Sequence, residues 1–142
     1  MKHSKSWLIL ILLAFSLHFV WEKSHLPLYY GYQNLSPFLP ITIWATVGDV
    51  LYTLVVVGIA TLFKKDFGWI KNIGRKDIIG LAIAGFFVAL FVEYKAFAFN
   101  LWFYSSEMPI IPIIRVGLSP VLQMTILLPL SVYITNKLSL VF

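Results

Sequence analysis

The stretch FVEYKAFAFNLWFYSSEMPIIPIIRVGLSP, residues 91–120, places ionisable side chains inside sequence that is otherwise apolar enough to lie in lipid. Glu93 is the clearest case, because a carboxylate within a hydrocarbon-length segment is costly and by default indicates a functional site. Asn100, Tyr104 and Glu107 follow Glu93 at spacings that fit one helix face. We therefore take this stretch as the centre of a candidate site.

The composition indicates an integral membrane protein. Of the 142 residues, 60% are hydrophobic and 12% are charged, against about 45–50% and about 25% in an ordinary soluble domain. A helical span needs about 20 apolar residues, so the length allows a single integral membrane domain, residues 1–142, with four spans and short loops. Because the chain has no cysteine, any metal would need histidine and carboxylate ligands.

Four apolar segments predict an all-α polytopic membrane protein, a four-transmembrane-helix bundle. We expect the spans at about residues 7–25, 41–63, 78–104 and 113–135. The first span follows Lys2 and Lys5 as the core of a secretory signal peptide does, with Ala14 and Ser16 as small residues before a cleavage point. The helical pattern nevertheless continues to Glu22, which favours a retained first helix.

The connections are predicted from their prolines, glycines and charges. Residues 26–40 contain three prolines and a tyrosine cluster, which is typical of a loop lying against the membrane surface. Residues 64–77 hold five basic residues and two glycines and form the clearly aqueous loop, whereas residues 105–112 form a short turn. Pro120 and Pro129 fall inside the predicted last span, where prolines are tolerated and predict kinks.

The basic residues predict the orientation of the bundle. With four spans, the N-terminus, the 64–77 loop and the C-terminus share one side, which carries Lys2, Lys5, Lys64, Lys65, Lys71, Arg75, Lys76 and Lys137. The other side has Lys23 and, at a helix end, Arg115. The positive-inside rule therefore predicts a multi-pass protein of the cell membrane with cytoplasmic amino and carboxyl termini. The formal charge of +5 is interpreted as topology signals and contacts with membrane lipids, not as nucleic-acid binding.

Counting about 1.5 Å per helical residue places the polar residues of all four spans between the membrane midplane and the outer surface. Those at i, i+4 and i+7 share a helix face, and the resulting stripes are His18, Glu22 and His25; Glu93, Asn100 and Tyr104; and Arg115, Ser119 and Gln123. Stripes that face one another would build a hydrated cavity opening outward above a dry cytoplasmic half. Asp49 would join it from the second span, and Gly48 would let another helix approach closely.

The candidate catalytic residues are Glu93, Asp49, Glu22 and His18. A histidine four residues before a glutamate fits a metal ligand pair, a general acid/base pair or a hydrogen-bonded pair between helices, and all three remain open for His18 and Glu22. Carboxyl groups that share a small low-dielectric site cannot all ionise. At least one is therefore expected to keep its proton near neutral pH and to serve as an acid or proton carrier.

The candidate substrate-binding residues are Asn100, Tyr104, Arg115 and Gln123. The Arg115 guanidinium fits either an anionic head group or an interfacial salt bridge with Glu107 across the predicted turn. Lys95 lies two positions after Glu93 and therefore faces elsewhere, either toward lipid or toward an acid of the second span. Trp102 shares the face of Lys95 and is interpreted as an interface anchor.

Several cofactor signatures do not occur in the sequence. It contains no phosphate-binding glycine-rich loop, GxSxG, HExxH or CxxC pattern, so no nucleotide cofactor is expected. A divalent metal at His18 and Glu22 is the cofactor that the residues would allow. The aromatic residues, 17% of the chain, fit helix packing and interface belts first, and a pocket for an isoprenoid-like ligand second.

The segments HFVWE at 18–22, GD at 48–49, Glu93, NLWFY at 100–104 and EMP at 107–109 resemble, in their order, a type of small prokaryotic four-span membrane protein. The resemblance covers most of the chain. It implies the four-span fold and brings no assigned activity and no residue roles.

Three functions remain open from the sequence. The first is an enzyme that performs acid/base or metal-assisted chemistry on a lipid or isoprenoid, which requires a cavity joined laterally to lipid. The second is an oligomeric carrier or channel component whose acids relay protons or bind a cation. The third is a nonenzymatic assembly or accessory subunit, which predicts satisfied polar side chains and no cavity. The partners expected are membrane lipids and a homo-oligomer or another membrane protein.

Overall fold

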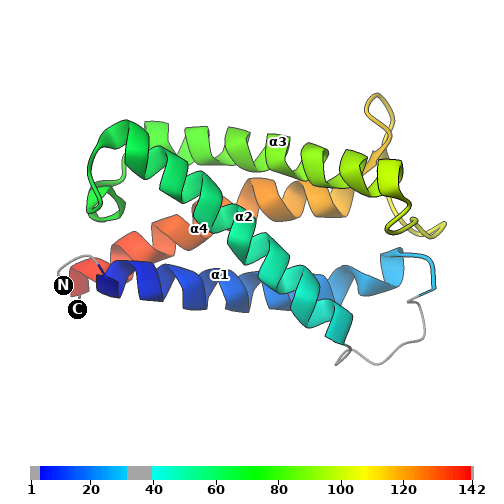
Figure 1. Cartoon of the computed structure of the whole chain (residues 1–142), viewed down its shortest axis with the longest axis horizontal. Coiled ribbons are helices and arrows are strands. Elements are labelled where there is room, and N and C mark those ends of the chain that lie inside the picture. The colour runs from blue at the N-terminus through cyan, green and yellow to red at the C-terminus, as the bar shows by residue number, and fades with distance from the viewer. Residues whose placement is uncertain (1–3, 32–39, 142) are drawn as a thin grey trace.

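The computed structural model describes residues 4–31 and 40–141, and in these ranges the chain is a bundle of four long helices (Figure 1). The helices are α1 (Ser4–His25), α2 (Pro40–Lys64), α3 (Arg75–Phe99) and α4 (Leu118–Val141). Each is long and apolar enough to cross a membrane, which confirms the predicted all-α four-helix bundle. The start of α1 and the end of α4 lie at the same end of the bundle, called here the terminal end (Figure 1).

The first two predicted spans agree closely with α1 and α2. A 3₁₀-helix, η1 (Leu26–Leu28), follows α1 directly. The rest of the first loop, residues 32–39, lies outside the described residues, so the prediction that it rests against the membrane surface applies to a part of the chain not described here. Figure 1 shows α2 crossing the bundle obliquely, while α1, α3 and α4 run more nearly along its long axis.

The predicted third span is wrong at its carboxyl end, because α3 stops at Phe99 and not at residue 104. The next residue, Asn100, takes the left-handed conformation with φ 52° and ψ 42°, which asparagine tolerates better than most residues. The Leu101 N–H then donates to the Ala96 carbonyl at 3.0 Å, which closes a Schellman-type helix end. The helical face predicted to run from Glu93 to Tyr104 therefore ends before Tyr104.

The chain between α3 and α4 forms a small cap in place of the predicted short turn. Strands β1 (Ile110–Ile111) and β2 (Val116–Gly117) pair antiparallel. The cap also joins the end of α1, because Tyr29 and Tyr104 form an isolated antiparallel bridge. Two backbone hydrogen bonds extend that bridge, from Tyr30 N to Phe103 O at 2.8 Å and from Ser105 N to Leu28 O at 2.9 Å.

The predicted fourth span begins too early, because α4 starts at Leu118 and not at residue 113. Arg115 precedes the helix, in the cap, with φ 53°. Pro120 lies in the first turn of α4, where its missing N–H removes no intrahelical hydrogen bond. Pro129 is the proline inside α4.

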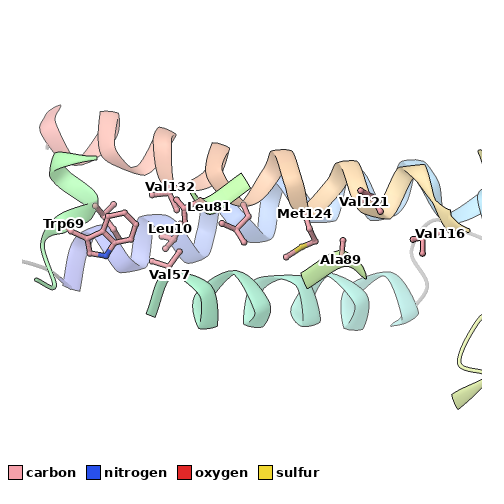
Figure 2. Packing of buried hydrophobic residues seen from close by; sticks show 11 residues of the cluster. Leu10, Val57, Trp69, Leu81, Ala89, Val116, Val121, Met124 and Val132 are labelled. Carbon is pink, nitrogen blue, oxygen red and sulfur yellow. The ribbon is translucent and has the colours of Figure 1, made fainter. Parts of the chain in front are cut away.

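An apolar core occupies the half of the bundle toward the terminal end and continues along α4 (Figure 2). In Figure 2, Trp69 lies at one end of the labelled cluster and Val116 at the other, and both are nearly fully buried. Trp69 belongs to a 3₁₀-helix, η2 (Trp69–Asn72), and its Nε1 donates to Thr61 Oγ1 at 2.8 Å. The 64–77 connection is thus only partly aqueous as predicted, because Trp69 and its neighbour Ile70 fold back under the bundle.

Helices α3 and α4 approach each other closely at Gly85. A Cβ atom added at Gly85 would lie 2.3 Å from the Met124 carbonyl oxygen, a separation that no side chain can adopt. Ala89 and Ala96 continue this buried face of α3 with small side chains, as is typical where helices pack closely in membranes. The close approach brings Glu93, which lies on the same face, against α4.

Replacing Gly85 by alanine should therefore destabilise the bundle by about 1–3 kcal/mol, the usual cost of overpacking a filled interior. Thermal unfolding in detergent measures the effect as a lowered Tm. The matched control is Gly58→Ala, since a Cβ at Gly58 meets no atom within 4 Å and alanine is the better helix former. Equal stability of the two variants would contradict the tight contact between α3 and α4.

Candidate functional site

A cavity of about 350 Å³ lies between the helices, in the half of the bundle away from the terminal end. Its polar lining comes from all four helices: Glu22 from α1, Asp49 from α2, Glu93 and Lys95 from α3, and Gln123 from α4. Three carboxyl groups therefore share one cavity whose remaining walls are largely apolar and aromatic. Glu93 is 2% exposed and lines the same cavity as Asp49, as the depth count predicted.

The lining of the cavity includes residues exposed on the outside of the bundle, at the start of α2 and just after α3. Three of its lining residues are exposed there, namely Ile41, Trp44 and Leu101 at 42%, 71% and 54%. Ile41 and Trp44 belong to the first turns of α2, and Leu101 follows the last turn of α3. In a membrane this apolar mouth would face the lipid near its boundary with water.

Gln123 joins three of the predicted residues. Its Nε2 lies 2.7 Å from Asp49 Oδ2, 2.9 Å from Glu22 Oε1 and 3.2 Å from His18 Nδ1. His18 Nδ1 also lies 3.5 Å from Asp49 Oδ2. An amide group has two N–H donors, and three side chains lie within reach of the Gln123 nitrogen.

Glu22 has a second partner on its own helix, His25. Glu22 Oε2 lies 3.2 Å from His25 Nε2, and His25 Nδ1 lies 2.9 Å from Ser119 Oγ at the start of α4. Trp21 Nε1 donates to the same Ser119 hydroxyl at 3.2 Å. The polar stripe predicted on the first span therefore does face the fourth helix, with Ser119 and Gln123 as its partners.

Glu93 is held from the cap instead of from its own helix face. Its Oε2 accepts hydrogen bonds from Trp102 Nε1 at 3.2 Å and from the Tyr104 hydroxyl. The Tyr104 hydroxyl in turn accepts a hydrogen bond from Gly117 N at 2.9 Å. Trp102 thus contacts a carboxylate, which was not predicted for it, and Tyr104 reaches Glu93 although it lies off the helix.

The Tyr104 hydroxyl stays protonated and can therefore always donate its hydrogen bond to Glu93. Burial, together with the hydrogen bond to Glu93, raises the pKa of the Tyr104 phenol far above its ordinary value, so the hydroxyl keeps its proton at any pH that a cell experiences. Gly117 makes room for it, since a Cβ at that position would lie 3.1 Å from Tyr104 Cζ and 2.9 Å from Met108 Sδ. The cap is therefore fitted around this hydrogen bond.

Lys95 also lines the cavity, which helical spacing alone did not predict. Its Nζ donates to the Tyr52 hydroxyl at 3.1 Å and lies 5.7 Å from the centre of the Tyr52 ring. Lys95 thus turns toward the second span, as one of the two alternatives had it, but its partner is a tyrosine and not an acid. In the described ranges, no ion pair joins it to Asp49 or Glu93.

Two predicted substrate-binding residues lie away from the cavity. Asn100 is exposed because its left-handed backbone ends α3, and Arg115 is exposed in the turn between β1 and β2. Within residues 4–31 and 40–141, no ion pair joins Arg115 to Glu107, which is also exposed. Gly48 does not mediate a close helix contact either, since a Cβ there would meet no atom within 4 Å; it borders the cavity.

Of the three roles left open for His18 and Glu22, the hydrogen-bonded contact between helices is the one that their neighbours illustrate, and the metal ligand pair stays a prediction. His18 Nδ1 turns to Gln123 and Asp49, and the second oxygen of Glu22 turns to His25. Among the described residues, no group of three or more His, Cys, Asp or Glu side chains is arranged to hold a metal ion.

The contacts of Trp102 and Lys95 were not predicted, because the local sequence indicates them only weakly. Asn100 is a recognisable helix-stop residue, and treating it as one would have placed Trp102 and Tyr104 in a returning segment. The direction of Lys95 has no such signal, because its long side chain can turn either way.

The comparisons with known proteins add no relative: no protein-family model matches the chain, and no curated protein and no solved structure matches it.

Substituting Tyr104 by phenylalanine should destabilise the protein by about 1–3 kcal/mol, because the buried Glu93 carboxylate loses a donor and the Gly117 N–H loses its acceptor. Denaturant or thermal unfolding in detergent provides the measurement. Tyr30→Phe is the matched control, since Tyr30 is 72% exposed. If both variants unfolded like the wild type, the cap would not be holding Glu93.

Proposed function

We propose that this protein is an integral membrane enzyme that transfers protons to and from an unsaturated, isoprenoid-type lipid. The observation that carries the proposal is the single cavity in which the carboxyl groups of Glu22, Asp49 and Glu93 meet an apolar and aromatic wall. A largely apolar pocket with a few convergent polar groups is the usual form of a small-molecule site. Buried carboxyl groups supply the acid and the base that such chemistry needs.

The position of the exposed lining residues supports a route by which the substrate enters the cavity from the membrane. Ile41, Trp44 and Leu101 surround its mouth and are exposed on the side of the bundle, so an apolar chain would slide in from lipid without crossing water. The polar groups of the lining come from all four helices. A substrate would thus present a reactive double bond to the carboxyl groups while its remaining chain stayed in or near the bilayer.

The carboxyl groups fall into two sets with opposite roles: Glu22 and Asp49 would donate a proton, and Glu93 would accept one. Glu22 and Asp49 share the Gln123 amide, and because two carboxyl groups so close cannot both ionise, the pair holds a proton that Asp49 delivers to one carbon of the double bond. The resulting carbocation loses a proton from a neighbouring carbon to Glu93, and the double bond re-forms in a new position. A proton passing back from Glu93 to Asp49 resets the site.

His18, Gln123 and the cap position these two groups. His18 and Gln123 orient Asp49 from one side, and Trp102 and Tyr104 fix one oxygen of Glu93 while leaving the other for the substrate. Fixed donors around developing charge need no rearrangement during the reaction, which is the main source of electrostatic catalysis.

The cavity also separates this proposal from its alternatives. An accessory subunit whose polar residues only glue helices predicts no cavity, whereas about 350 Å³ of open volume lies beside the carboxyl groups. A carrier or channel needs the polar path to continue toward the terminal end, where the apolar cluster of Leu10, Val57 and Leu128 instead fills the bundle. The enzyme is therefore the function that the geometry supports best.

The topology proposed with this function places both termini in the cytoplasm and the cavity in the outer half of the cell membrane. Exposed basic residues at the terminal end, including Lys65, Arg75 and Lys76, support this orientation through the positive-inside rule.

Asp49→Asn or Glu93→Gln should lower the reaction rate by at least about 100-fold, the usual contribution of a general acid or base. The measurement is chromatography and mass spectrometry of total isoprenoid lipids from cells that express each variant, where an isomerised lipid keeps its mass and changes its retention. Glu107→Gln and Asp66→Asn are controls at exposed carboxylates outside the cavity. A lipid profile that Glu93→Gln leaves unchanged would count decisively against the enzyme.

Gly48→Leu should abolish the reaction at nearly unchanged stability, because the new side chain enters open space beside Asp49 and occupies the volume of the substrate. The same lipid assay and a thermal unfolding curve measure the two effects. Gly58→Leu adds the same side chain at another open position of α2, outside the cavity lining, and should keep its activity. Full activity in the Gly48 variant would mean that substrate does not use this cavity.

A further inference from the structure

Glu93 forms no ion pair in the part of the chain that the structure describes. The side chain is 2% exposed, and its hydrogen-bond donors, the Trp102 indole and the Tyr104 hydroxyl, are both neutral. Both donate to Oε2, and no described residue donates to Oε1. A buried carboxylate of this kind is costly unless a positive charge pairs with it.

The other charged groups around the cavity are already engaged elsewhere. Glu22 pairs with His25 at 3.2 Å, and Asp49 lies 3.5 Å from His18. Lys95, the one ammonium group in the lining, bonds to the Tyr52 hydroxyl and lies beside its ring. The lining thus sets three carboxyl groups against one ammonium group, and Glu93 is the member without an ionic partner.

Aromatic side chains form much of the wall near Glu93. Tyr29, Trp44, Tyr52 and Trp102 all line the cavity, and the ring of Tyr29 lies edge-on to Trp102 with their centres 6.3 Å apart. The faces of tryptophan and tyrosine rings attract cations, most strongly where water is excluded. A carboxylate beside aromatic faces is the combination that binds alkylammonium groups.

We infer that the cavity binds an amphipathic cation: an alkyl chain that enters between α2 and α3 and carries a quaternary or tertiary ammonium head next to Glu93 and Trp102. Such a molecule supplies the positive charge that Glu93 lacks, and its chain fits the apolar mouth at Ile41, Trp44 and Leu101. It also has the charge of the carbocation in the proposed reaction. This inference deepens the proposed function, yet the binding itself depends only on the contacts of Glu93.

The test measures binding of two probes to the full-length protein in phosphatidylcholine nanodiscs. One probe is tetradecyltrimethylammonium, and the other is the neutral hydrocarbon of the same length that ends in a tert-butyl group, which has nearly the same shape. Native mass spectrometry and tryptophan fluorescence report the bound fraction. We expect the cation to bind at least about tenfold more tightly than the neutral probe, because only the cation is attracted electrostatically to Glu93 and to the aromatic faces.

Glu93→Gln should remove this preference, because the cationic probe should bind about tenfold more weakly while the neutral probe binds as before. Glu107→Gln, an exposed carboxylate outside the cavity, should bind both probes as the wild type does. Equal binding of the two probes by the wild type, or a preference that survives Glu93→Gln, would overturn the inference. If circular dichroism shows that the Glu93 variant does not fold, Gly48→Leu takes its place, and undiminished cation binding there would overturn it equally.

The outcome is separable from that of the proposed function. Glu93-dependent cation binding together with an unchanged lipid profile would retain the binding site and reject the enzyme. A lipid profile that depends on Glu93 in a protein without cation preference would do the reverse.

Discussion

Three carboxyl groups inside a membrane-length bundle, two of them buried and one partly buried, must each find hydrogen-bond donors, and the polar half of this structure is arranged around that requirement. The Gln123 amide serves Glu22 and Asp49, and Trp102 and Tyr104 serve Glu93. Gln123 lies on α4, far from Glu22 and Asp49 in sequence, whereas Trp102 and Tyr104 lie in the cap, shortly after Glu93. The requirement therefore ties α1, α2 and α4 together at one point and fastens the cap to α3 at another.

Most of the fold could be predicted from hydrophobicity, because span length and loop charge follow directly from the bilayer as a solvent. The errors fall between residues 100 and 117, where an apolar cap has the same composition as a helix and only the asparagine at 100 marks the stop. In the site, depth counting brought Glu22, Asp49, Glu93 and Gln123 together correctly. Tyr104 was assigned to the right partner for the wrong reason, since the folded-back chain, and not the helix face, carries it to Glu93.

Glycines show why the remainder of the site could not be predicted. Gly85 and Gly48 each lie within an apolar helix, yet the first is pressed against the Met124 carbonyl and the second faces open space in the cavity. A missing side chain thus permits contact at one position and creates volume at the other. Which of the two occurs depends on where α4 and α2 lie in space, and this is a property of the assembled bundle that no local pattern records.

The apolar half of the bundle also has an electrical consequence. Ionisable groups inside a membrane endanger the gradients that the membrane maintains, because a hydrated path from side to side would let protons flow down the transmembrane potential. Here Leu10, Val57, Leu81 and Val132 fill the bundle between the carboxyl groups and the terminal end. In a membrane, that layer would separate the carboxyl groups from the terminal end and would interrupt a hydrated path for protons.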